Sequence, residues 1–162
     1  EKVIIKPTVG ANADKIMIIK KSDTMDKLKK TKDTYKNRQF ILQPFINSIK
    51  KDGEMSLIFF NKGFSHGLSK IPKKGDFRVQ EEHGGKLELL ENLNEQVINL
   101  CKKVLSILPY DCFYSRIDLV FDRGLPLLME IEVIEPSLYF NLEPKSAKLF
   151  AKKVSDFFNH QC

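Results

Sequence analysis

The stretch Tyr114–Tyr139, YSRIDLVFDRGLPLLMEIEVIEPSLY, predicts a β-hairpin around which the rest of the chain is organised. Residues 113–121 and 127–134 are rich in β-branched and aromatic side chains, which favour strands. Asp122-Arg123-Gly124 lies between them and has the composition of a turn. We therefore expect two antiparallel arms that are joined by a short loop.

Three acidic residues interrupt these arms: Asp118 in the first arm, and Glu130 and Glu132 in the second. Side chains alternate along a strand, so Glu130 and Glu132 point to the same face. An odd-length loop centred on Gly124 would place Asp118 directly opposite Glu130. Three converging carboxylates repel one another unless a cation neutralises them, and oxygen ligands suit Mg²⁺ or Mn²⁺. The alternative is a solvated strand face whose apolar neighbours point inward.

The length of 162 residues fits one ordinary domain or two small lobes that share a core. The net charge of +6 is compatible with a nucleic-acid surface, an anionic small ligand such as a nucleotide, or simple solubility. Only four residues are arginine, which reads bases and phosphates better than lysine does, and most lysines are scattered. We therefore do not expect nucleic acid as a partner.

Cysteine usage and hydropathy bear on where the protein works. Cys101, Cys112 and Cys162 are odd in number and lack the spacing of metal ligands, which predicts reduced thiols in the cytoplasm. No apolar run approaches the roughly 20 residues of a membrane span, so no membrane association is expected. The chain opens inside the apolar run Val3–Ile5 without an initiator methionine, which suggests a piece of a longer protein.

Residues 1–45 are predicted to form a small lobe with the order β-β-α-β. Ser22 or Asp23 would cap its mostly charged helix. Met25 and Leu28 would be the main apolar contacts of that helix. The strands are expected at residues 3–6, 16–19 and 40–42.

Residues 46–162 are predicted to form the larger lobe. A first hairpin, at residues 54–60 and 63–69, would turn at Asn61-Lys62-Gly63. Asn92 or Asn94 would cap an amphipathic helix, and Pro144 would open the last helix. The buried stripe of the amphipathic helix is expected to consist of Val97, Leu100 or Cys101, Val104 and Leu108.

Three segments carry residues suited to a phosphate-bearing ligand. Lys6 ends a strand before a small-residue loop and could hold phosphate oxygens, although an ordinary β-turn has the same composition. Residues 43–46 lie between the lobes, where an extended backbone can read an adenine edge or simply act as a linker. The loop 73–86 offers Arg78 to a transferring phosphoryl group and Gly84-Gly85 for close approach to a ligand.

Several motifs occur together and in one order along the chain. This ordered set resembles the C-terminal two-thirds of the ATP-grasp domain of glutathione synthetase-like carboxylate–amine ligases, in the branch that includes the cycloserine-forming enzyme. The resemblance covers essentially all 162 residues. The motifs are VIIKPTVGANAD (3–14), LQPFI (42–46), GEMSLIFFNKGFSHGLSKIPKKGDFRVQEEHGG (53–85), RIDLV (116–120) and LMEIEVIEPSLYF (128–140).

The resemblance implies an α+β fold with a small α/β lobe (1–45) and a larger lobe (46–162) built on a mostly antiparallel sheet flanked by helices. It also implies ATP-dependent activation of a carboxylate as an acylphosphate, which an amine or a similar nucleophile then attacks. ATP and Mg²⁺ or Mn²⁺ would be the cofactors.

Individual roles follow from the same resemblance, position by position. Glu132 stands where many relatives have asparagine, which keeps the ligand oxygen and adds a charge. The implied roles are phosphate binding for Lys6, adenine binding for Gln43, Phe45 and Ile46, ribose contact for Glu54, catalysis for Lys70 and Arg78, and metal binding for Asp118, Glu130 and Glu132.

The resemblance also implies that the chain is incomplete, because the N-terminal substrate domain of the family and its lysine-bearing strand are missing. The expected partners are therefore that missing domain of the same protein, the nucleotide, and small carboxylate and amine substrates. The sequence leaves open whether the protein forms a homodimer. The alternative functions are a non-catalytic nucleotide-binding scaffold or regulatory module and, on charge alone, a nucleic-acid module.

Overall fold

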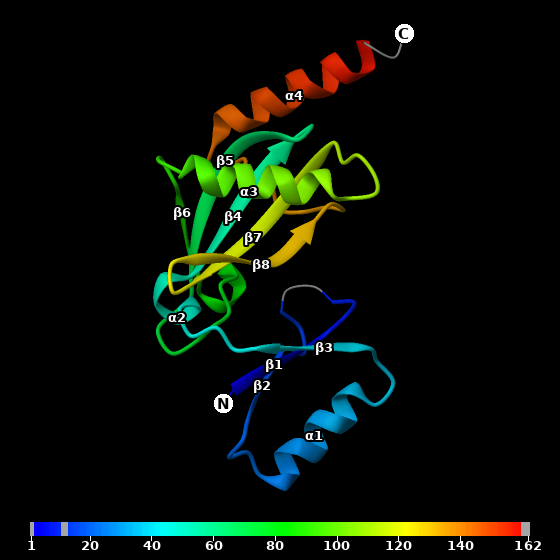
Figure 1. The fold of residues 1–162 in the computed structure, drawn as a ribbon, viewed down its shortest axis with the longest axis vertical. Coiled ribbons are helices and arrows are strands. Elements are labelled where there is room, and N and C mark those ends of the chain that lie inside the picture. The colour runs from blue at the N-terminus through cyan, green and yellow to red at the C-terminus, as the bar shows by residue number, and fades with distance from the viewer. Residues whose placement is uncertain (1, 11–12, 160–162) are drawn as a thin grey trace. The chain divides into compact units, whose positions relative to one another are not determined.

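Eight strands, all paired antiparallel, form two separate sheets in the computed structural model, which describes residues 2–10 and 13–159. The first sheet has the order β2-β1-β3 and the second has the order β6-β5-β4-β7-β8. They belong to two units of the chain, Glu1–Asn47 and Ser48–Cys162. Helices accompany both sheets, and the predicted α+β class is confirmed (Figure 1).

The first unit has the predicted element order, with β1 (Lys2–Pro7), β2 (Met17–Lys20), α1 (Met25–Tyr35) and β3 (Phe40–Pro44). The predicted caps of α1 are wrong. Its N-cap is Thr24, whose side chain accepts a hydrogen bond from the backbone N–H of Lys27. Asp23 cannot serve as the cap because its carboxylate accepts from the backbone N–H of Lys20 and pairs with the Lys27 ammonium.

The anchor of α1 is also different from the expectation. Met25 is 68% exposed and Leu28 is 37% exposed, whereas Tyr35 is buried. The Tyr35 hydroxyl group donates to backbone carbonyl groups of Ile5 and Lys15, and its ring contacts Phe40 edge-on. Thr31 and Tyr35, in the second half of the helix, are therefore buried in place of Met25 and Leu28.

The second unit contains most of the chain. Asn61 and Lys62 join β4 to β5 with φ angles of 48° and 63°, which is the geometry of a tight type I′ turn and confirms the predicted hairpin. The elements are α2 (Ile49–Asp52), β4 (Glu54–Phe60), β5 (Gly63–Ile71), a 3-10 helix (Glu81–His83), β6 (Lys86–Leu89), α3 (Glu95–Ser106), β7 (Tyr114–Asp122), β8 (Leu125–Glu132) and α4 (Pro144–Asn159).

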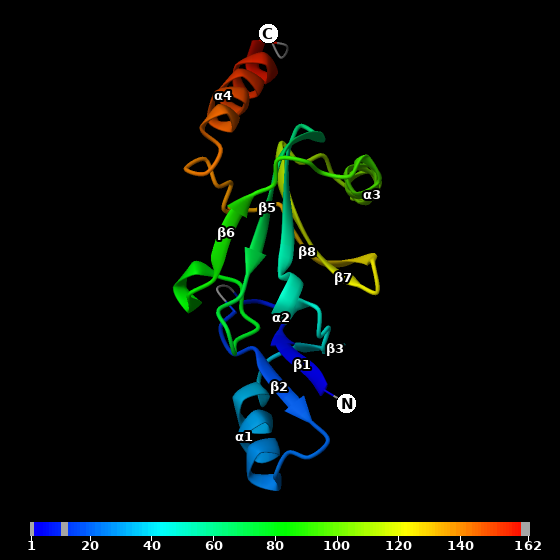
Figure 2. The same cartoon turned by 90° about the vertical axis from the view of Figure 1, so that its left-hand side faces the viewer.

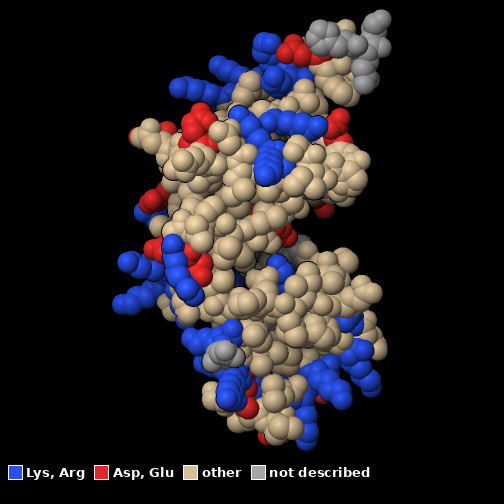
Figure 3. Space-filling model, viewed as in Figure 1, with Lys and Arg blue, Asp and Glu red and all other residues tan. Residues whose placement is uncertain are grey.

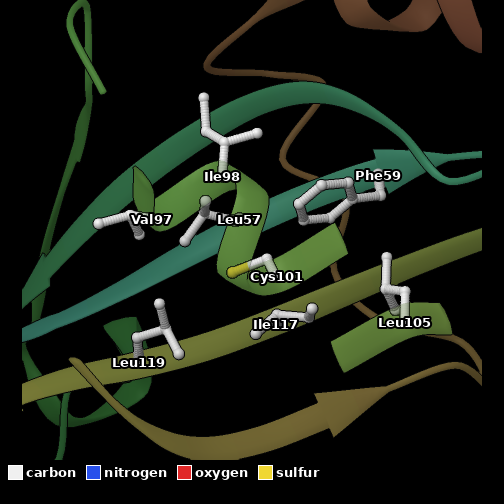
Figure 4. Close-up of a cluster of buried hydrophobic side chains, with 8 residues drawn as sticks. All are labelled: Leu57, Phe59, Val97, Ile98, Cys101, Leu105, Ile117 and Leu119. Atoms are coloured by element: carbon white, nitrogen blue, oxygen red, sulfur yellow. The ribbon is translucent and has the colours of Figure 1, made fainter. Parts of the chain in front are cut away.

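One face of the five-stranded sheet packs against α3, as Figures 2 and 4 show. The residues of β4 and β7 that face this helix are apolar, and Cys101 of α3 is fully buried among them, as predicted. Asn94 caps α3 by accepting from the backbone N–H of Gln96. The predicted stripe is confirmed for Val97, Cys101, Val104 and Leu108, with Cys101 rather than Leu100 as the buried alternative, but it omitted the buried Ile98 and Leu105.

The opposite face of the sheet is covered by the segment that follows β8 and by Phe150 of α4. Ile58, Phe60 and Leu68 form its buried apolar part. Pro144 stands at the first turn of α4, as expected for a residue without a backbone N–H. Lysine and arginine side chains are spread over both units on the face seen in Figure 3.

Candidate metal centre

The polar residues of the second sheet gather on the face opposite α3, because side chains alternate along each strand. Ile117 and Leu119 of β7 point toward α3, so Arg116 and Asp118 point to the other face. Asp118 is 1% exposed and lies opposite Ser56 of β4. The alternation of side chains along β7 therefore places the buried Asp118 carboxylate on the face of the sheet that is opposite α3.

The pairing of β7 with β8 brings the second and third carboxylates to Asp118. Asp118 is directly opposite Glu130, as predicted, but the predicted odd-length loop is wrong. The turn consists of two residues, Arg123 and Gly124, and Asp122 pairs with Leu125. Met129 is an extra residue that shifts the register by one, and this bulge places Glu130 rather than Met129 opposite Asp118.

Asp118, Glu130 and Glu132 form a cluster in which each residue offers one oxygen atom, and these oxygen atoms lie within 4.8 Å of one another. Asp118 is buried, Glu132 is half-buried and Glu130 is exposed, so the cluster opens to solvent on the side of β8. Carboxylate oxygens are the donors that Mg²⁺ and Mn²⁺ prefer. The donor set and its spacing fit a divalent cation.

Three neighbours fix the Asp118 carboxylate. Arg116 donates from Nε and Nη2, with Nη2 at 2.9 Å from Oδ2. Lys70 Nζ lies 3.4 Å from Oδ2, and the Ser56 hydroxyl group donates to Oδ1. Burial alone would raise the pKa of Asp118, but Lys70, Arg116 and the hydrogen bonds outweigh it and hold the pKa below its usual value. Asp118 is therefore ionised and held in one orientation.

Lys70 connects this cluster to Glu54. Lys70 and Glu54 are directly opposite each other on β5 and β4, and their charged atoms are 2.7 Å apart. Burial raises the pKa of Glu54, and the Lys70 ammonium offsets only part of that effect. Burial also disfavours the Lys70 ammonium, but Asp118 and Glu54 overcome this and raise its pKa. Both residues, predicted at the sequence level as site residues, thus lie in one buried network with Asp118.

Arg116 is a site residue that the sequence reasoning missed. Its guanidinium group joins Asp118 to Glu132, which faces it on β8. Burial raises the pKa of Glu132, and Arg116 partly counteracts this while Glu130 and Asp118 add to it. Arg116 precedes Asp118 by two positions on one strand, so the alternation rule was a sufficient signal to place it beside the carboxylates.

The charges of the cluster do not balance without a further cation. Four carboxylates meet two cationic side chains, which leaves a net charge of −2 when every group is in its usual ionised form. A divalent ion would offset this charge, most strongly at the buried and half-buried members of the cluster. The residues involved are Glu54, Asp118, Glu130, Glu132, Lys70 and Arg116.

Arg78 has a partner of its own in the loop that follows β5. Its Nε and Nη2 atoms donate to both oxygens of Asp76, the shortest distance being 2.7 Å. This pairing, opposed by desolvation, holds the pKa of Asp76 well below its usual range. Among the described residues no ion pair joins Arg78 to the carboxylate cluster. This pairing leaves the N–H groups of Nη1 and the second N–H group of Nη2, and the predicted catalytic role of Arg78 stays a prediction.

The glycine pair of this loop has a structural reason. A Cβ atom at Gly85 would lie 2.1 Å from the carbonyl oxygen of Val79, so only glycine allows the loop to fold back on itself there. Gly84 has a φ of +81°, which glycine adopts at little cost. The group that approaches Gly85 closely is therefore the backbone of the same loop, at Val79 and Gln80.

The predicted ATP-binding residues of the first unit lie on or next to its sheet. Gln43 is directly opposite Ile4, and Ile4 and Lys6 are two positions apart on β1. Lys6 and Gln43 therefore share one face of the small sheet. Phe45 is buried and Ile46 is half-buried directly after β3. Their contact with a nucleotide stays a prediction.

The two sheets and the carboxylate cluster fit the ATP-grasp class of proteins, and the comparison with known families shows that class. Residues 1–146 match the family described as prokaryotic glutathione synthetase, ATP-grasp domain, and the chain belongs to this family. In the part of the chain that the structure describes, no helix is long and apolar enough to cross a membrane.

Particular relatives narrow the comparison. The cycloserine biosynthesis protein DcsG of Streptomyces lavendulae is 27% identical over 134 residues, a match that covers 72% of this chain and 41% of the relative. The crystal structure of D-cycloserine synthetase DcsG superposes with a TM-score of 0.79 at 22% identity over 96% of this chain and 55% of that one. The crystal structure of D-alanine–D-alanine ligase from Bacillus anthracis superposes with a TM-score of 0.67 at 19% identity, and the match covers 96% of this chain and 52% of the ligase. The chain thus spans about half the length of these relatives.

Proposed function

We propose that this chain is the nucleotide- and metal-binding part of an ATP-dependent ligase that activates a carboxylate for attack by an amine or a similar nucleophile. The observation that supports this most is the cluster of Asp118, Glu130 and Glu132, whose oxygen atoms come within 4.8 Å of one another in a segment that matches the ATP-grasp family. Among the structural relatives, one is a D-alanine–D-alanine ligase complexed with ATP, and another is the ligase PsnB complexed with Mg and ADP.

In this proposal Asp118, Glu130 and Glu132 hold Mg²⁺ or Mn²⁺, which when bound supplies positive charge to the phosphate oxygens of ATP. Arg116 and Lys70 keep the Asp118 carboxylate ionised and fix its direction. The net charge of −2 on the cluster matches the charge of one such ion.

Residues of the first unit are proposed to bind the nucleotide. Lys6 would bind phosphate oxygens, and Gln43, Phe45 and Ile46 would contact adenine. Support for this comes from the register, which puts Lys6 and Gln43 on one face of the small sheet. Glu54 is proposed to lie near the ribose, and its pairing with Lys70 gives it the further role of holding that ammonium group.

The reaction proposed has two steps. The terminal phosphoryl group of ATP passes to the substrate carboxylate, giving an acylphosphate and ADP, and the nucleophile then displaces phosphate to form an amide-like bond. Arg78, which also pairs with Asp76, and the Lys70 ammonium, which also pairs with Glu54 and Asp118, are proposed to stabilise charge on the phosphoryl oxygens and the reacting acyl group. The substrates are proposed to be small molecules, bound together with a further domain of the same protein.

A test compares the protein at its full natural length with the double variant Glu130→Gln plus Glu132→Gln. Calorimetry should show Mg-ATP or Mg-ADP binding by the unchanged protein and a large loss in the variant, while circular dichroism stays the same. Glu88→Gln, in β6 and paired with Lys86, is the matched control. Silence of the unchanged protein at millimolar nucleotide would refute the proposal, and full turnover by the double variant would refute the metal assignment.

A second candidate is a nucleotide-binding module without catalysis. This alternative predicts nucleotide binding by the full-length protein with no release of ADP in any mixture of amino acids and other small carboxylates and amines. ADP release that depends on one carboxylate and one nucleophile would exclude it.

A further inference from the structure

Tyr139 lies in the segment that follows β8 and faces the buried guanidinium group of Arg116. The Arg116 Cζ atom is 5.9 Å from the centre of the Tyr139 ring, which is within the range of a cation–π contact. Among the described residues, none forms a hydrogen bond with the Tyr139 hydroxyl group. Tyr139 therefore contacts Arg116 through its aromatic ring and not through its hydroxyl group.

The backbone of Tyr139 has an unfavourable conformation that its surroundings maintain. Its φ is +52°, a region that tyrosine rarely adopts and that is found where the structure overrides local preference. The carbonyl group of Tyr139 accepts from the backbone N–H groups of Leu142 and Glu143. These bonds fix the turn in which the ring is presented to Arg116.

A histidine of the sheet anchors the same segment. His66 is 6% exposed on β5, and its Nε2 atom is 3.0 Å from the carbonyl oxygen of Leu138. The carbonyl can only accept, so Nε2 carries a hydrogen, and Nδ1 is 2.9 Å from the Ser65 hydroxyl group. The residue directly before Tyr139 is therefore tied to strand β5 of the sheet.

Arg116 in turn controls two of the three clustered carboxylates. Its Nε and Nη2 atoms donate to Asp118, and Nη2 also donates to Glu132. A planar guanidinium group fixes the direction of both partners only if the group itself is fixed. The carboxylates supply one side of this restraint, and the Tyr139 ring supplies another.

We propose that Tyr139 is a positioning residue whose aromatic ring holds the Arg116 guanidinium group in the orientation that aligns Asp118 and Glu132 for a divalent cation. The cation in this statement rests on the proposed function. The contact between Tyr139 and Arg116 does not, so the two can be tested separately.

The first test measures the contact by NMR in the full-length protein labelled with ¹⁵N at arginine. The Arg116 Nε–H signal is identified by its disappearance in Arg116→Lys. Tyr139→Phe keeps the ring and should leave this signal nearly unchanged, whereas Tyr139→Leu should move it and speed its exchange with water. Tyr110→Leu, an exposed tyrosine in the loop after α3, is the control and should leave it unchanged. An Arg116 signal that does not respond to Tyr139→Leu overturns the inference.

The second test measures Mn²⁺ affinity by calorimetry in the same set of proteins. Tyr139→Leu should weaken binding by about two- to thirty-fold, which corresponds to the range of cation–π contacts, and Tyr139→Phe should restore it. Tyr139→Asn removes the ring and tolerates a positive φ, so it replaces the leucine variant if that one does not fold.

The outcomes separate this inference from the proposed function. An unchanged protein that binds no Mn²⁺ overturns the metal assignment, and with it the role of Tyr139 in cation binding. Normal Mn²⁺ binding by the unchanged protein, Tyr139→Leu and Tyr139→Asn alike overturns the positioning role and leaves the proposed function standing.

Discussion

Asp118 and Glu130 lie directly opposite each other on β7 and β8, although the two-residue turn alone would place Met129 opposite Asp118. The one extra residue in β8 corrects the register. A shift of one residue exchanges the two faces of a strand. Because of the bulge, Asp118 faces Glu130 instead of Met129. For the same reason, Arg116 faces Glu132 instead of Ile131. The carboxylate cluster therefore depends on the turn and the bulge together.

The turn between β7 and β8 can be tested by two substitutions of opposite effect. Arg123 and Gly124 have φ angles of 51° and 81°, as a type I′ turn requires. Gly124→Ala should lower the free energy of unfolding by about 1 kcal/mol, because alanine is strained at positive φ. Arg123→Asn should raise it by a few tenths of a kcal/mol, since asparagine tolerates this region. Urea denaturation measures both, and changes of the same sign would contradict the turn assignment.

His66 predicts a dependence of stability on pH. Desolvation lowers its pKa in the folded protein, although its hydrogen bond to Leu138 and the charge of Glu143 act in the opposite direction. The unfolded chain then binds the proton more readily than the folded protein does. The contribution of neutral His66 to the free energy of unfolding is therefore complete above the unfolded pKa of about 6.5 and is lost as the pH falls below it. His66→Gln retains a donor at the same place but has no charge to gain.

The measurement is urea denaturation of both proteins at several pH values between 5 and 8. The difference in unfolding free energy between the original protein and His66→Gln should move in favour of the variant as the pH falls below about 6.5. Two parallel pH profiles would show that His66 does not titrate differently in the folded state.

Local sequence signals were sufficient for several elements and failed where tertiary contacts decide. Asn61-Lys62 and Asn94 were predictable because a tight turn and a helix cap each need a particular residue type at one position. Thr24 was not, because Asp23, an equally good cap by composition, is occupied by Lys20 and Lys27. The strand β6 (Lys86–Leu89) was not predicted, and its first residue was assigned to the preceding loop. Its pairing with β5 is what defines it as a strand.

The site shows the same division. Glu130 and Glu132 could be assigned to one face by alternation, and alternation also places Arg116 beside Asp118. The bulge at Met129 has no signature in the sequence, since it follows from pairing two strands whose apolar patterns differ by one residue. Tyr139 lies outside regular structure, so no periodicity could bring it to Arg116.

Cys101 and Cys112 should differ strongly in their reactivity. Burial raises the pKa of Cys101 to about 11, and the residue is fully buried against the sheet, while Cys112 is half-buried in the loop before β7. Only about 0.1% of such a thiol is ionised at pH 8, and the thiolate is the reactive form. Brief treatment of the folded protein with iodoacetamide, followed by mass spectrometry of peptides, should modify Cys112 and spare Cys101. Equal modification of the two would mean that the packing of α3 against the sheet does not shield the Cys101 thiol.

Lys70→Met tests how much the buried charge network contributes to the fold. Removing the ammonium group leaves Glu54 and Asp118 close together in a buried place with Arg116 as the remaining cation. Breaking such a network typically costs about 3–5 kcal/mol in unfolding free energy. Lys152→Met, which removes an exposed ion pair with Asp156 in α4, is the control and should change stability by less than about 0.5 kcal/mol.

The loss of unfolding free energy in Lys70→Met should also depend on the pH and on added divalent cations. Because the pKa of Glu54 is raised by burial, acid should protonate Glu54 first and reduce the deficit of the variant. An added divalent cation should recover part of the lost stability if it binds the carboxylates that Lys70 left unpaired. Urea denaturation with and without Mn²⁺ at pH 5 and pH 7 measures both effects. A variant as stable as the original protein at neutral pH would mean that the network does not hold the two strands together, since neither carboxylate would then need the ammonium group.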